Sequence, residues 1–283
     1  GSIINYGVPR YRQLNSKHLD VVDKRSQNGT IYLHARTNAS KVDIHTTIRN
    51  QLFENEKQYQ LHTSKVQEAD KEIYEQLKFN AQKGKTYKLE KTAAIYTSRD
   101  MDVADPQQSS LMNAENAADF ETLFISHRDY WHGMWEKTGI EVEGDRFTQK
   151  VARLHTYHLL VTGSPHNQNF DAGIPARGLH GEAYRGHIFW DEVYILPFYV
   201  KHYPEIVNAF LKYRYRRLDD ARAYAREHGY SGAMFPWQTA DDGKEETQEI
   251  HYNPVSGDWG PDLSRRQRHV SIAIAYDVLE YMK

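Results

Sequence analysis

Residues 178–192 read Gly178-Leu179-His180-Gly181-Glu182-Ala183-Tyr184-Arg185-Gly186-His187-Ile188-Phe189-Trp190-Asp191-Glu192, and they are the most informative stretch of the chain. An aromatic ring recognises the C–H face of a sugar, while carboxylates and other polar groups bond its hydroxyls. The adjacent Trp190 and Asp191 supply both kinds of contact. The alternative is a helix start with a buried tryptophan and a capping aspartate, and this stretch alone favours that simpler interpretation.

A second stretch, residues 234–249, combines an aromatic residue with a tight turn and several carboxylates. Glycoside cleavage needs an acid for the leaving oxygen and a partner that activates the attacking group. The alternative is a solvated charged turn, which is the usual explanation of an isolated Glu-Glu pair. The candidates in this stretch are Trp237, Asp241, Glu245, Glu246 and Glu249.

The pattern of the chain changes near residue 100. Before it, apolar and polar residues alternate, which predicts half-buried antiparallel strands over 30–36, 42–48, 87–91 and 93–97, with strands and a long hairpin in 55–79. After it, helical spacing predicts helices over 114–135, 147–161 and 207–225, and a last helix capped by Ser264. The loops between them, 164–184 and 230–263, hold both informative stretches, which is typical of a site on a helical scaffold.

Composition narrows the class of protein. The 283 residues include 36 Lys+Arg and 38 Asp+Glu, a net charge of -2, so nucleic acid is not an expected partner. The sequence has no apolar run long enough for a membrane span, and it lacks a secretory pattern, which favours a cytoplasmic location. With no cysteine, no zinc-type histidine spacing and no phosphate-binding glycine loop, neither a metal nor a nucleotide cofactor is expected.

Together the two stretches resemble glycoside hydrolase family 65, which holds maltose, kojibiose, nigerose and trehalose phosphorylases and some α-glucoside hydrolases. The resemblance is carried by Gly-Glu-x-Tyr-x-Gly-His-x-Phe-Trp-Asp in 181–191, by 196–199, 213–222, 229–237 and 243–246, and by 7–15 near the start. It implies a multidomain chain, β and then α. The implied parts are a portion of an amino-terminal β-sandwich (1–104), a helical linker (105–145) and the first part of an (α/α)6 barrel catalytic domain (146–283).

The resemblance also implies an activity, namely inverting cleavage of an α-glucosidic bond in a disaccharide or oligosaccharide. Phosphate as a co-substrate, or activated water, would attack the anomeric carbon, with no cofactor and a homodimer as a possible assembly. The resemblance further implies that Trp190 and Asp191 hold the non-reducing glucose, that the loop 241–246 shapes the acceptor side, and that Gln267 stands at the position of the general acid. With the candidates from the two stretches, the expected substrate-binding residues are Glu182, Arg185, His187, Trp190, Asp191, Trp237 and Asp241, and the expected catalytic positions are Glu245, Glu246 and Gln267.

Two departures from the family pattern matter. The helix that the general acid usually opens reads Gln267-Arg268-His269 here, and an amide cannot deliver a proton. Glu246, Glu245 or Glu249 has then taken over the role, which is the favoured explanation. Otherwise the helix aligns in another register, or the chain is a carbohydrate-binding homologue that lost its acid.

The chain is also short for the family, so we expect it to be part of a longer protein. The linkage, and the choice between phosphorolysis and hydrolysis, stay open.

Overall fold

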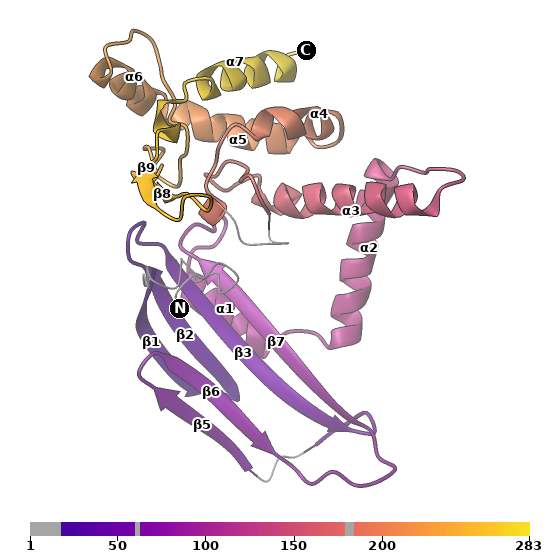
Figure 1. Ribbon diagram of the computed structural model, residues 1–283. Helices are drawn as coiled ribbons and strands as arrows, with labels where there is room; N and C mark the ends of the chain where they lie inside the picture. Colours follow the sequence, from indigo (N-terminus) through magenta and orange to yellow (C-terminus); the bar gives the residue numbers. More distant parts are fainter. Residues whose placement is uncertain (1–17, 60–62, 179–183) are drawn as a thin grey trace. The chain divides into compact units, whose positions relative to one another are not determined.

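The computed structural model describes residues 18–59, 63–178 and 184–283 (Figure 1). The chain divides into two compact units, residues 1–131 and 132–283. Strands form the first unit together with helix α1, and helices dominate the second, as the sequence predicted. None of the described helices is both long enough and apolar enough to cross a membrane.

The first unit is built on an antiparallel sheet in which β3 pairs with β2 on one side and β7 on the other. Asn28 and Gly29, with φ of 51° and 74°, form the turn between β1 and β2, where a tight hairpin requires left-handed backbone. The expected strands 87–91 and 93–97 are one strand, because Thr92 keeps the pairing with Arg49 unbroken. The strands are β1 (Leu19–Gln27), β2 (Thr30–Thr37), β3 (Asp43–Glu54), β4 (Lys57–Gln58) and β7 (Tyr87–Thr97).

The two faces of this sheet are covered differently. Thr47 of β3 is hydrogen-bonded to Ser110 of α1 (Pro106–Glu115) at 3.0 Å between their hydroxyl oxygens. Asn50 of β3 donates to Glu75 at 2.9 Å, in a separate hairpin of β5 (Thr63–Ala69) and β6 (Glu72–Lys78). Because side chains alternate along a strand, α1 covers one face and the β5–β6 hairpin lies against the other.

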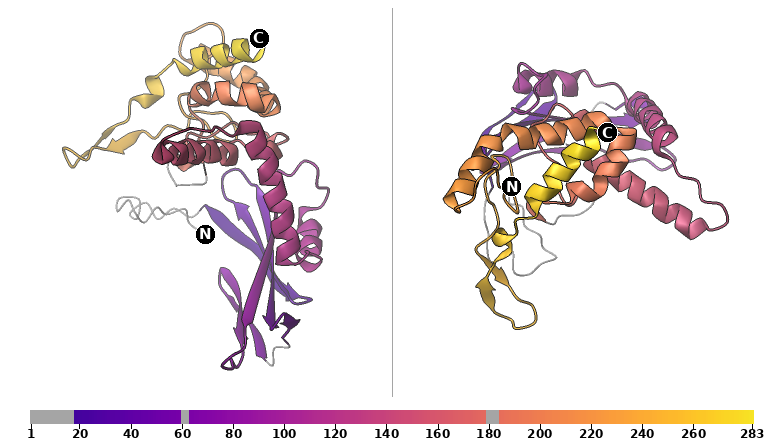
Figure 2. Two further views of the ribbon diagram at one scale, coloured as in Figure 1. Left: turned by 90° about the vertical axis from the view of Figure 1, so that its right-hand side faces the viewer. Right: turned by 90° about the horizontal axis from the view of Figure 1, so that it is seen from above.

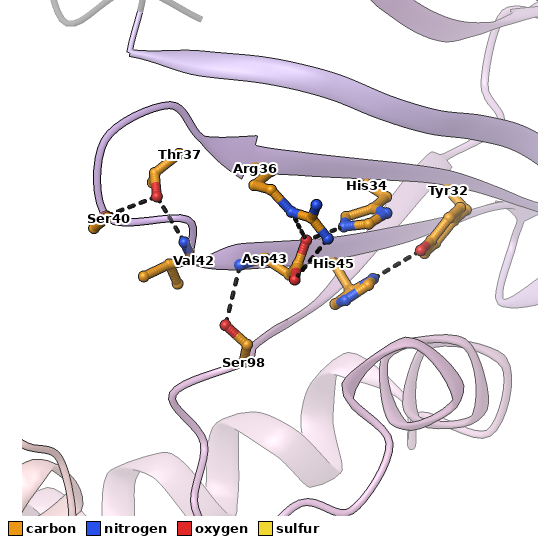
Figure 3. Close-up of polar contacts among 9 residues, drawn as sticks. All are labelled: Tyr32, His34, Arg36, Thr37, Ser40, Val42, Asp43, His45 and Ser98. Carbon is orange, nitrogen blue, oxygen red and sulfur yellow. Dashed lines mark hydrogen bonds and ion pairs between the residues drawn. The ribbon is translucent and has the colours of Figure 1, made fainter.

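A polar network lies on the α1 side of β2 and β3 (Figure 3). The Tyr32 hydroxyl bonds Nδ1 of His45 at 2.7 Å, and the rings of His45 and His34 stack at 4.3 Å. His34 and Arg36 both bond Asp43, at 2.6 and 2.7 Å. Burial lowers the pKa of His45, and the Arg36 hydrogen bond lowers the pKa of Asp43. The folded state therefore favours neutral His45 and ionised Asp43.

The second unit contains helices α3 (Arg146–Thr162), α4 (Glu192–His202), α5 (Pro204–Arg216), α6 (Leu218–Glu227) and α7 (Val270–Tyr281), while α2 (Phe120–Thr138) spans the boundary between the units. Side chains buried on α4, α5 and α7 form its core: Leu196, Tyr199, Val207, Phe210 and Val270. A short hairpin of β8 (Ile250–Tyr252) and β9 (Trp259–Pro261) extends away from these helices (Figure 2). The (α/α)6 barrel expected for this region stays a prediction.

The expected helices 147–161, 114–135 and 207–225 differ in how well their limits agree with the structure. The helix expected over 147–161 is α3, and the structure shows that Asp145 caps its start and Gly163 ends it. The helix expected over 114–135 is instead two helices, because Asp119 accepts the Thr122 N–H at 2.8 Å and starts α2 anew. The helix expected over 207–225 divides at Arg217 into α5 and α6.

The start of the last helix was also predicted wrongly. Ser264 opens a short 3-10 turn, η4 (Ser264–Arg266), and His269 is the N-cap of α7. The η4 turn closes through Gln267, whose N–H donates to the Ser264 carbonyl at 2.9 Å while its own backbone is extended. A helix cannot continue through an extended residue, so α7 begins after it.

The polar network predicts sensitivity to acid. Since the folded state lowers the pKa of His45, the unfolded chain binds more protons below about pH 6.5, and stability falls as pH falls through that region. The lowered pKa of Asp43 adds a further loss at more acidic pH. Urea unfolding of the protein and of the His45→Gln variant between pH 5 and pH 8 tests this. The variant should show the weaker pH dependence, while His18→Gln, at an exposed position, should match the unsubstituted protein. Equal slopes for all three would contradict the assignment.

Candidate active site

The two stretches singled out in the sequence lie side by side in the second unit. The Ile188 N–H donates to the Thr239 carbonyl at 2.8 Å, and the Thr239 N–H donates back at 3.0 Å. Next to this bridge, the Gln238 amide nitrogen lies 2.5 Å from Nδ1 of His187. The backbone therefore fixes the loop that carries Trp190 against the loop that carries Trp237.

Aromatic rings gather beside this bridge. The ring centroids of Trp190 and Trp237 are 6.3 Å apart, and the Phe189 ring lies edge-on to Trp237 at 5.6 Å. The His269 ring contacts both indoles, at 4.6 Å from Trp190 and 5.2 Å from Trp237. The Phe235 N–H donates to the Ser271 hydroxyl at 3.0 Å, which fixes the second loop to the start of α7. The expected sugar-binding tryptophans thus form one aromatic cluster.

A buried ion pair between α4 and α5 holds the loop that carries Trp190. Arg214 of α5 bonds Glu192 of α4 at 2.9 Å, and their side chains are 3% and 2% exposed. Arg214 also donates to the Phe189 carbonyl at 2.9 Å, while Glu192 accepts the Ile174 N–H at 3.1 Å. These two side chains therefore place Phe189, and with it Trp190 and Asp191, at the start of α4.

A second arginine holds the acidic loop. Arg217 pairs with Asp171 at 3.0 Å, lies 3.8 Å over the Tyr213 ring and donates to the Asp241 carbonyl. Gly243 follows with φ of 79°, and a Cβ there would lie 2.3 Å from Cδ of Arg217. The loop after Trp237 can take this course only because residue 243 has no side chain.

The two adjacent glutamates of the acidic loop have different surroundings. The Glu245 carboxylate accepts hydrogen bonds from the N–H groups of Trp237, Gln238 and Thr247, at 3.0, 3.3 and 3.0 Å, and from the Thr247 hydroxyl at 2.5 Å. Its oxygens are committed to holding the loop together. Glu246 is placed by its backbone, whose N–H donates to the Gln238 carbonyl at 2.9 Å.

The electrostatics differ among the site residues. Burial raises the pKa of Glu246, the nearby Asp242 raises it further, and Arg185 partly opposes this. Burial likewise raises the pKa of Asp191. Burial, with Arg185, lowers the pKa of His187 to about 4, so its imidazole is neutral at pH 7. The site thus offers carboxyl groups with raised pKa values and an uncharged hydrogen-bonding imidazole.

Arg185 sits in a strained turn. Tyr184 and Arg185 have φ of 54° and 55°, a left-handed backbone conformation that residues other than glycine seldom adopt. Residues in such conformations cluster at ligand-binding and catalytic sites, where the surroundings hold them in place. The strained backbone of Arg185 accords with the site role expected for this residue, which stays a prediction.

The structure brings some of the predicted site residues together and leaves others apart. It brings together His187, Trp190, Trp237, Glu245 and Glu246, and it places Asp191 directly after Trp190. Gln267 lies at the end of η4, two residues before His269. Glu182 lies outside the described residues.

Two residues in contact with the site were missed. Gln238 gives no sequence signal beyond following Trp237, and His269 was noted only as part of a helix start. The described residues contain no group of three side chains that could hold a metal ion.

Neighbouring loops of the second unit thus bring together two indoles and several carboxylates, which are the kinds of groups that bind sugars. The glycosyl hydrolase family 65 N-terminal domain matches residues 1–134, and the glycosyl hydrolase family 65 central catalytic domain matches residues 153–283. The chain therefore belongs to glycosyl hydrolase family 65.

Similar proteins support this membership. An uncharacterized glycosyl hydrolase of Mycobacterium tuberculosis is 37% identical over 99% of this chain and 21% of its own length. The trehalose 6-phosphate phosphorylase of Lactococcus lactis is 35% identical over 99% of this chain and 35% of its own length. A solved structure from the human microbiome, described provisionally as a kojibiose phosphorylase, shares the fold with a TM-score of 0.71 at 23% identity, over 94% of this chain and 33% of that one. The chain thus spans between a fifth and about a third of these proteins.

The close approach of Arg217 to Gly243 predicts a specific sensitivity. Gly243→Ala should lower stability more than Gly232→Ala, because both glycines have positive φ but only a Cβ at 243 meets another residue. The backbone strain, about 1 kcal/mol or more, is common to both. The displacement of Arg217 is specific to Gly243→Ala and should also reduce turnover. Thermal unfolding and activity of the two variants check this, and equal losses would show that the approach of Arg217 is not limiting.

Proposed function

We propose that the protein containing this chain cleaves an α-glucosidic bond with inversion and transfers the glucosyl group to inorganic phosphate. The observation that carries the proposal is that the Ile188–Thr239 bridge joins the loop of Trp190 and Asp191 to the loop of Trp237 and Glu246, with the two indoles 6.3 Å apart. The similarity to a trehalose 6-phosphate phosphorylase supports phosphate, rather than water, as the attacking molecule.

The aromatic cluster and its polar neighbours would bind the glucosyl ring. The indoles of Trp190 and Trp237 offer apolar faces to the C–H side of a sugar. Asp191, Arg185 and the neutral His187 supply hydrogen-bonding groups for its hydroxyls. Because Arg214 and Glu192 hold this loop from a buried position, binding would require little rearrangement of it.

Glu246 is the group that would act as the general acid. Its raised pKa favours the protonated form, which can pass its proton to the glycosidic oxygen as the bond to the anomeric carbon breaks. A phosphate oxygen would attack that carbon from the opposite face, giving β-glucose 1-phosphate from an α-glucoside. Glu245 would keep the loop in shape, because its oxygens already accept four hydrogen bonds from Trp237, Gln238 and Thr247.

An acid role for Glu246 makes a prediction that depends on the leaving group. Glu246→Gln should lower phosphorolysis of disaccharides by about 10²- to 10⁴-fold, the usual contribution of a general acid. α-Glucosyl fluoride should be far less affected, because fluoride leaves without a proton. Turnover of trehalose, kojibiose, maltose and nigerose with phosphate, compared with the fluoride, provides the measurement. Glu249→Gln, at an exposed neighbouring position, is the matched control. Equal losses on both substrate types would remove Glu246 from this role.

A second candidate function rests on Gln267. If the general acid belongs at this position, the protein binds sugars without cleaving them, because an amide cannot donate the required proton. Disaccharides should then bind, as measured by calorimetry, without turnover in the presence of phosphate. Gln267→Glu should create activity under the same conditions. Turnover by the unsubstituted protein that depends on Glu246 would exclude this candidate.

A further inference from the structure

His269 occupies a special position beside the aromatic cluster. It is the N-cap of α7, and its carbonyl accepts the N–H groups of Ile272 and Ala273 at 3.1 and 3.0 Å. The backbone of His269 is thus part of a regular helix, which is a firmer support than a loop. Its side chain reaches Trp190 and Trp237, which both lie on loops.

The contacts of this side chain are aromatic. The His269 ring meets Trp190 at an interplanar angle of 76° and Trp237 at 60°, so it lies steeply inclined to both indoles. Edge-to-face contacts of this kind depend on ring orientation, because the positive edge of one ring faces the negative face of the other. One imidazole therefore restrains the planes of both indoles.

One of the two ring nitrogens of His269, Nε2, makes no hydrogen bond with the described residues. This atom is also buried. Leaving a buried polar nitrogen unpaired is unfavourable. Because this atom is covered, a sugar lying on the indoles would not reach it directly. The buried Nε2 thus argues against a contact between this atom and substrate, and the aromatic contacts are the interactions that the structure gives this ring.

The backbone alone does not account for the orientation of the indoles. The Ile188–Thr239 bridge fixes where the two loops run, but the side chains of Trp190 and Trp237 begin two residues away from it on either loop. The Phe235–Ser271 hydrogen bond ties one loop to α7 at a point two residues from His269. The start of α7 is therefore held against the loop of Trp237, close to the point where the His269 ring contacts both indoles.

We propose that His269 is a positioning residue that sets the mutual angle of Trp190 and Trp237 and so shapes the surface offered to the sugar. The sugar-binding part of this inference rests on the proposed function, whereas the restraint on the two indoles does not. The role requires a planar aromatic ring at position 269 and does not require its nitrogen.

Three variants of the full-length protein separate the ring from the nitrogen. His269→Ala removes both, His269→Phe keeps an aromatic ring, and His269→Gln keeps a polar atom near the place of Nε2. The first readout is the near-ultraviolet circular dichroism of tryptophan without sugar, and the second is the separate measurement of KM and kcat. His228→Ala is the matched control, because His228 lies edge-on to Tyr224 at 4.5 Å in the same way but contacts neither indole.

We expect His269→Ala to weaken the tryptophan signal and to raise KM by about three- to tenfold, the range for loss of an aromatic contact, with a smaller change in kcat. His269→Phe should restore both readouts and His269→Gln neither. Rescue by Gln but not by Phe would overturn the proposal in favour of a polar contact. An unchanged tryptophan signal in His269→Ala would overturn it as well. The signal needs no substrate, so a protein that turns over no sugar would contradict the proposed function without deciding this inference.

Discussion

The buried ion pair of Arg214 and Glu192 is the constraint on which the rest of the candidate site depends. Removing two charges from water is costly, and such a pair is tolerated only when further hydrogen bonds satisfy its atoms. Here those bonds come from the loop itself, through the Phe189 carbonyl and the Ile174 N–H. The groups that satisfy the ion pair are thus the backbone atoms that place Trp190 and Asp191. The same helix end holds the acidic loop through Arg217, so α5 fixes both loops that form the site.

The Arg214–Glu192 pair also affects the pKa of a third buried group, the carboxyl of Asp277. Asp277 of α7 is 1% exposed, and burial, followed by the charge of Glu192, raises its pKa to about 7. Arg214 faces both carboxyl groups, and one guanidinium cannot neutralise two buried charges. Burial raises the pKa of Glu192 as well, and the ion pair with Arg214 opposes that rise. Glu246 lies outside this cluster, where its raised pKa follows from burial and from Asp242 rather than from a structural ion pair. Scaffold acids and the candidate catalytic acid are thus separated in space.

Much of the fold followed from local patterns, and the misses have local causes. Alternation predicted β2 and β3, and helical spacing predicted α3, because these signals act within a few residues. The break at Arg217 could not be predicted, since its cause is a set of contacts with Asp171 and Asp241 that are distant in sequence. The start of α7 was missed because a serine before a polar run resembles an N-cap, whereas here the chain first makes a 3-10 turn. The sequence indicated Trp190 and Trp237 as site residues, but it could not predict the Ile188–Thr239 bridge that joins their loops.

The distinction between Glu245 and Glu246 shows what sequence reasoning lacks. Adjacent identical side chains have the same chemistry and charge and nearly the same stretch of sequence around them, so no pattern separates them. In the structure Glu245 accepts N–H groups from three residues of its own loop, while Glu246 is held by its backbone. A carboxylate whose oxygens already accept several hydrogen bonds within its own loop is not free to approach a leaving group. Burial, followed by the charge of Asp242, raises the pKa of Glu246. The loop therefore uses one glutamate to hold its own shape, and this is what leaves the next one available for chemistry.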